Sequence, residues 1–71
     1  MLSLKVDGNK ARRLRERRGL TVVAVADAAG CTKWNIYKIE KGKVQPSARV
    51  FEGMKRILQA ADEQLTADGA A

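Results

Sequence analysis

The stretch TVVAVADAAGCTKWNIYKIEKGK, residues 21–43, decides the fold of this chain. It predicts two short helices, 22–29 and 33 to about 41, because a threonine that can cap a helix N-terminus precedes each of them. Gly30 ends the first helix, and only two residues separate it from the second. The small side chains of VVAVADAA allow a neighbouring helix to approach closely. The stretch therefore indicates a compact helix pair joined by a tight turn.

The second of these helices has two different faces. At about 100° per residue, Ile36 and Ile39 fall together and define a buried face. The opposite face carries large aromatic and cationic side chains, namely Trp34, Tyr37, Lys38 and Lys41. Two interpretations of Trp34 are open, because its ring either folds back over a neighbouring part of the protein or meets a ligand or partner.

The flanking residues predict further helices. A first helix is expected from about residue 8 to 18, capped by Asp7, and its arginines are expected to form a solvated face. Ser47 can cap a last helix that follows an apolar stripe to about Thr66. This last helix either continues or breaks near Gln59 into two. Gly53 is expected to weaken it by up to about 1 kcal/mol relative to alanine.

The ends of the chain carry weaker signals. Residues 1–7 are expected to be an extended N-terminal segment, with or without a short strand at 2–6. Residues 67–71 are expected to fray. We therefore expect one all-α domain over residues 1–71, built as a compact four- to five-helix bundle.

Composition limits the chemistry. The chain has no His and a single Cys, Cys31, so an internal disulfide and a Cys/His metal site are both excluded. No Ser or Cys has an evident base partner, so we expect no catalytic residue, no cofactor and no small-molecule ligand. No apolar run reaches the roughly 18 residues that span a bilayer, and the N-terminus lacks the apolar core of a signal peptide. A cytoplasmic protein that is not an enzyme is expected.

The charge of the chain is unevenly distributed. The net charge is +6, with eleven Lys/Arg against four Asp/Glu in residues 1–43 and three against four in residues 44–71. This asymmetry fits a polyanionic partner, and it equally fits a basic surface that keeps the protein soluble.

Several short motifs occur together in a fixed order. They are Leu14-Arg15, Gly19-Leu20-Thr21, Val25-Ala26, Gly30, Thr32, Ile36, Ile39, Glu40-Lys41-Gly42-Lys43, Pro46-Ser47, Phe51, Met54 and Leu58. In this order and spacing the sequence resembles the Cro/repressor-type (XRE) helix-turn-helix family over about residues 9–58. The resemblance implies a lambda-repressor-like DNA-binding domain. Val22 and Val23 depart from the pattern, since polar residues are common there.

The resemblance also implies site residues. In this family the second helix of the motif enters the major groove of double-stranded DNA. Base-reading residues would be Lys33, Trp34, Tyr37 and Lys38. Phosphate contacts would come from Thr21, Val22, Thr32, Asn35, Lys43 and Arg15, with Val22 acting through its backbone amide. Arg15 would also pair with Glu40, and this pair is either purely structural or a means of aiming Arg15 at the DNA backbone.

The function implied is that of a transcriptional regulator. We expect a small Cro-like repressor of phage or mobile-element type, located with the nucleoid, that binds a pseudo-palindromic operator as a homodimer. Ala61 and Leu65 are the expected dimer interface, with residues 2–6 as a second candidate. The alternative is a protein-interaction module, either an antitoxin or an adaptor, that grips a protein with the helix-turn-helix surface.

Overall fold

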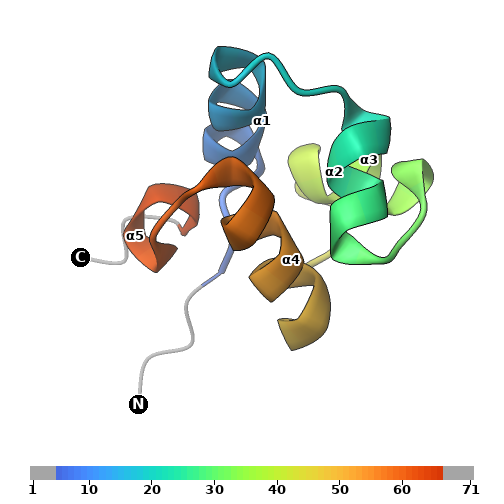
Figure 1. Ribbon diagram of the computed structural model, residues 1–71. Helices are drawn as coiled ribbons and strands as arrows, with labels where there is room; N and C mark the ends of the chain where they lie inside the picture. Colours follow the sequence, from blue (N-terminus) through green and yellow to red (C-terminus); the bar gives the residue numbers. More distant parts are fainter. Residues whose placement is uncertain (1–4, 67–71) are drawn as a thin grey trace.

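The computed structural model describes residues 5–66, which form five helices and no strand (Figure 1). The helices are α1 Gly8–Arg17, α2 Val22–Ala29, α3 Lys33–Glu40, α4 Ala48–Leu58 and α5 Asp62–Leu65. The expected all-α class is confirmed, and five helices is the upper number of the expected four to five. None of these helices has the length and apolar character that crossing a membrane requires.

Local capping explains where the first four helices begin. The side chains of Asp7, Thr21, Thr32 and Ser47 each accept a hydrogen bond from a backbone N–H in the first turn that follows. These oxygens satisfy donors that have no partner within the helix. After α2, Gly30 adopts a left-handed conformation with φ 74°, which costs a glycine little and turns the chain toward α3.

The helix predicted after Ser47 breaks at Gln59. This residue has φ 53° and ends α4, and α5 begins three residues later. Arg18, at the end of α1, donates from Nε to the Leu58 carbonyl at 2.8 Å and from Nη2 to the Gln59 carbonyl at 3.3 Å. A cation at a helix C-terminus satisfies the last carbonyls and complements the helix dipole. Arg18 is exposed, as expected of the arginines of α1, and it also joins the end of α1 to the end of α4.

The core lies where α2 packs against α3 and α4, and it extends to α1 and α5. The deepest side chains are Ile36, Ile39, Met54, Leu58, Leu65 and Val25. Gly53 permits the close approach of α4 to α2, because a Cβ built on it would lie 2.6 Å from Cα of Ala29. The expectation that small residues on 22–29 allow a close neighbour is thus confirmed, with α4 as that neighbour.

The segment that precedes α1 is tied on two sides. The Val6 N–H donates to Oε1 of Gln45 at 2.8 Å, and Nε2 of Gln45 donates back to the Val6 carbonyl at 3.3 Å. On the other side, Val6 forms a single antiparallel bridge with Thr66, and the Asp7 N–H donates to the Leu65 carbonyl at 2.8 Å. Residues 5–7 are therefore extended and joined to both the α3–α4 loop and the end of α5.

The structure corrects the expected dimer interface. Leu65 is 0% exposed, because the turn at Gln59 directs α5 back over the core of its own subunit. Its side chain is therefore unavailable to a second copy, whereas Ala61 is exposed. Val6, from the second candidate surface, is also buried. Lys5 of that candidate is exposed, while its remaining residues 2–4, and the predicted frayed tail at 67–71, lie outside the described residues.

Candidate nucleic-acid interface

Helix α3 divides into the two faces that its periodicity predicts. Ile36 and Ile39 are 0% and 1% exposed, whereas Trp34 and Tyr37 are 63% and 42% exposed. Lys33, Lys38 and Lys41 are exposed as well. The buried isoleucines fix the rotation of the helix about its axis, so the aromatic and cationic side chains must face away from the core.

Trp34 does not fold back over another helix. Its ring centroid lies 5.9 Å from that of Tyr37, with 43° between the planes, and Nζ of Lys33 lies 5.2 Å from the Trp34 centroid. These partners all belong to α3. The tilted ring pair and the neighbouring cation restrain the indole while leaving most of its surface open.

The exposed face of α3 borders a shallow depression. Its lining combines the two aromatic rings with four lysines, namely Lys33, Trp34, Tyr37, Lys38, Lys41 and Lys43. Among these, Lys41 is predicted on the exposed face by the sequence, but the predicted site residues do not include it. The signal for it was present, since Lys41 lies one turn after both Tyr37 and Lys38. A surface with this many cations and two apolar rings suits a polyanion that also presents flat or apolar groups.

The residues expected to contact phosphate differ in how exposed their side chains are. Thr21, Thr32 and Lys43 are exposed, and Asn35 is half-buried. Thr21 accepts from the Ala24 N–H at 3.1 Å and Thr32 from the Asn35 N–H at 3.2 Å, so both hydroxyls also cap their helices. Val22 has no polar side chain, and its side chain is buried, so only its backbone amide, at the N-terminus of α2, can donate to a phosphate.

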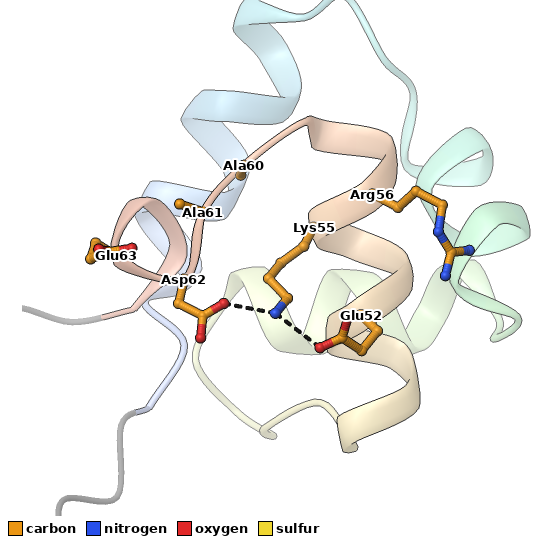
Figure 2. A pocket seen from close by; sticks show the side chains of 7 residues that line it. All are labelled: Glu52, Lys55, Arg56, Ala60, Ala61, Asp62 and Glu63. Carbon is orange, nitrogen blue, oxygen red and sulfur yellow. Dashed lines mark hydrogen bonds and ion pairs between the residues drawn. The ribbon is translucent and has the colours of Figure 1, made fainter.

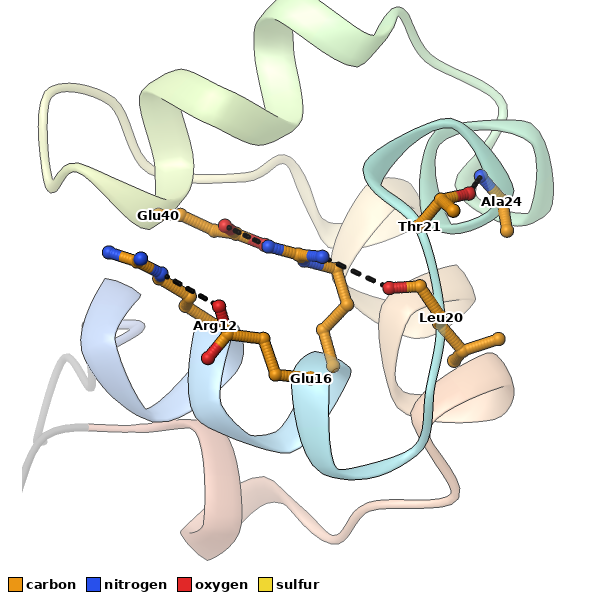
Figure 3. A network of polar contacts seen from close by, with 7 residues as sticks. Arg12, Glu16, Leu20, Thr21, Ala24 and Glu40 are labelled. Carbon is orange, nitrogen blue, oxygen red and sulfur yellow. Dashed lines mark hydrogen bonds and ion pairs between the residues drawn. The ribbon is translucent and has the colours of Figure 1, made fainter.

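Arg15 is held by protein oxygens. Its Nε lies 2.7 Å and its Nη2 3.2 Å from the two carboxylate oxygens of Glu40, and Nη1 donates to the Leu20 carbonyl at 3.0 Å. Figure 3 labels the two accepting residues, Glu40 and Leu20. Only 13% of the Arg15 side chain and 7% of the Glu40 side chain are exposed. The hydrogen bond to Glu40 raises the pKa of Arg15 despite partial desolvation. The pair joins α1 to the end of α3, and it leaves Arg15 little surface from which to reach a phosphate.

A second depression, between α4 and α5, has a different character (Figure 2). There Nζ of Lys55 lies 2.7 Å from Asp62 and 2.9 Å from Glu52, and it also lies 4.8 Å from the Phe51 ring centroid. Its hydrogen bonds to Asp62, which has the larger effect, and to Glu52 raise the pKa of Lys55. Because Lys55 is already paired with two carboxylates, this depression fits a contact that holds α5 against α4 better than it fits an anion site.

Known structures share this fold. The c2 repressor of P22, in complex with a synthetic operator, matches with a TM-score of 0.76 at 20% identity over 82% of this chain and 89% of its own. The restriction-modification controller protein C.AhdI from Aeromonas hydrophila matches with 0.73 at 21% identity over 80% and 86%. The clp gene regulator ClgR from Corynebacterium glutamicum matches with 0.71 at 22% identity over 76% of this chain, which spans 57% of ClgR.

At these identities the likeness establishes a common fold. The comparison with curated protein sequences returned no match. The family model for a helix-turn-helix domain matches residues 8–68, from the start of α1 to beyond α5. The motifs quoted from the sequence lie inside this span, and α2 and α3 form its two-helix unit. The chain belongs to the helix-turn-helix domain family.

Proposed function

We propose that this protein is a sequence-specific, double-stranded DNA-binding transcriptional regulator. One observation carries the proposal: α3 buries Ile36 and Ile39 and turns Lys33, Trp34, Tyr37 and Lys38 outward. An α-helix fits the major groove of B-DNA, and in a helix-turn-helix protein the second helix of the motif occupies it. These four residues are our proposed base-reading set.

Phosphate contacts would orient α3 in the groove. Thr21 and the Val22 backbone amide lie at the start of α2, Thr32 and Asn35 at the start of α3, and Lys43 just after α3. Exposed helix N-termini offer N–H donors and a favourable dipole to phosphate oxygens. We omit Arg15 from this set, because Glu40 and Leu20 already hold its guanidinium.

We further propose that the protein acts as a small Cro-like repressor in the cytoplasm, where it binds a pseudo-palindromic operator as a homodimer. A single recognition helix touches few base pairs, and two-fold pairing doubles the contact. The P22 c2 repressor, which has this fold, was solved with a synthetic operator. With Leu65 buried, Ala61 and its exposed neighbours in α5 are the proposed contact between subunits.

A second function uses the same surface differently. The exposure of Trp34 and Tyr37, together with Val23 and Val44, also suits a protein partner, as in an antitoxin or adaptor. The two proposals differ in salt dependence, because neutralising phosphates releases counterions and makes duplex binding fall steeply with salt.

Selection of bound duplexes from a random DNA pool tests the proposed function. We expect enrichment of one motif repeated with two-fold symmetry, with half-sites about 10 base pairs apart. A pool that stays random at low ionic strength would contradict DNA recognition, and a single unrepeated motif would contradict the dimer.

A further inference from the structure

Trp34 is the most exposed large hydrophobic side chain among residues 5–66. It occupies the second position of α3, and Tyr37 lies one turn further along the same face. A soluble domain gains nothing from an indole in water, so the apolar surface of this pair needs an apolar partner.

If α3 lies in the major groove, that partner has a restricted chemistry. Base edges in the groove present hydrogen-bond donors and acceptors, and they offer a single apolar group, the C5 methyl of thymine. The face of an indole ring pressed against amino, carbonyl or N7 groups would remove their water without replacing its hydrogen bonds, which is unfavourable, and only the single N–H at the ring edge can donate. A methyl group loses no hydrogen bond when the ring covers it.

We infer that the Trp34–Tyr37 surface reads the C5 methyl group of thymine, so that Trp34 is a specificity-determining residue through apolar contact. This inference rests on the proposed function and names what that surface recognises. Lys33, with Nζ 5.2 Å from the indole centroid, and the exposed Lys38 flank the ring with ammonium groups. Because lysine donates to O6 and N7 of guanine, the expected half-site contains thymine beside guanine.

The geometry of the ring pair supports this role. The indole is braced by Tyr37 at 5.9 Å and is not covered by α1, α2 or α4, so it offers a surface that is already formed before DNA binds. A preformed apolar surface loses little side-chain entropy on binding.

Deoxyuridine substitution isolates the methyl group, because uracil differs from thymine only at C5. Each thymine of the selected duplex is replaced in turn, and the Kd of the full chain is measured. We expect at least one position where deoxyuridine weakens binding about fourfold, the value of one buried methyl-sized group. With Trp34→Ala, the thymine and deoxyuridine duplexes should bind equally at that position.

Lys43→Ala is the matched control. It should weaken binding to both duplexes and leave their ratio unchanged, because a phosphate contact does not sense the methyl group. A ratio near one at every thymine in the wild-type protein would overturn the inference, and so would a selected site that lacks thymine. A ratio that persists in Trp34→Ala would assign the methyl contact to another residue and would also overturn it.

These failures differ from failure of the proposed function, which would yield no selected duplex at all. The wild-type ratio needs no variant, so it tests the inference even if Trp34→Ala unfolds. Thermal unfolding of Trp34→Ala by circular dichroism completes the comparison.

Discussion

Nε of Arg15 lies 2.7 Å from Oε2 of Glu40, and this ion pair joins the last turn of α1 to the last residue of α3. Both side chains are largely buried, and a second guanidinium nitrogen bonds the other carboxylate oxygen. The contact helps to fix where α3 ends relative to α1, and thereby the direction in which its exposed face points.

Removing one partner of this pair should destabilise the protein. We expect Arg15→Met to lower the free energy of unfolding by about 3 kcal/mol, because it leaves the Glu40 carboxylate buried without its partner. Folding raises the pKa of Arg15, so the stabilisation from its charge is complete at any pH below the pKa of an unfolded arginine. It should be lost only when the pH rises through the higher folded pKa, under strongly alkaline conditions. Urea denaturation measures the effect.

The exposed Arg12–Glu16 pair supplies the control for that measurement. Its side chains are 61% and 54% exposed, so Arg12→Ala should cost less than about 1 kcal/mol. Equal losses for Arg12→Ala and Arg15→Met would contradict a structural role for the Arg15–Glu40 pair.

A methyl group on Gly53 should separate α4 from α2. In an exposed helix, alanine stabilises the helix by about 1 kcal/mol relative to glycine. At position 53, however, its Cβ would lie 2.6 Å from Cα of Ala29 and 2.9 Å from the carbonyl oxygen of Ala28, both in α2. We expect Gly53→Ala to destabilise the protein by about 1–3 kcal/mol. Thermal unfolding beside the exposed-site variant Arg56→Ala measures this, and a stabilised Gly53→Ala would refute the close approach.

Arg18 should stabilise the end of α4 from a distance of 40 residues in sequence. We expect Arg18→Ala to cost about 1–2 kcal/mol, since the carbonyls of Leu58 and Gln59 lose a charged donor. Arg17→Ala, at the exposed neighbouring position, should be nearly neutral. Denaturant titration of both variants decides the matter, and indistinguishable midpoints would show that the Arg18 contact contributes no stability.

Lysines on and beside α3 should affect binding in two distinct ways. Lys33→Ala or Lys38→Ala should weaken the preferred duplex by about 1–3 kcal/mol and relax base preference. Lys43→Ala should weaken all duplexes alike and reduce the slope of log Kd against log salt by about one. Fluorescence anisotropy on selected and scrambled duplexes at several salt concentrations separates them. Identical behaviour of all three variants would reject the base-reading set.

Much of this fold is encoded in short stretches of sequence. The starts of α2 and α3 and the end of α2 follow from Thr21, Thr32 and Gly30, whose capping and turn preferences act within a few residues. The outward face of α3 follows from the spacing of Ile36 and Ile39, because helical periodicity alone places them together.

Contacts between residues far apart in sequence could not be predicted in this way. The sequence predicts only that Gly53 destabilises its helix, and the presence of a glycine there is explained by the close approach of Ala29. The sequence predicts Arg18 only as part of a solvated face, because nothing near it in sequence indicates that it donates to the carbonyl of Leu58 at the end of α4. The apolar stripe predicts Leu65 at an interface because Phe51, Met54 and Leu58 already supply its core, whereas the left-handed Gln59 turns Leu65 inward.

The central claim is that the outward face of α3 lies against a duplex. Adding a selected duplex to the isotope-labelled protein and following its backbone amide NMR signals tests it most directly. We predict that the largest shift changes fall at residues 21–22, 32–38 and 43, with residues 50–58 of α4 changing less. Changes centred on α4, or none at low ionic strength, would contradict the account.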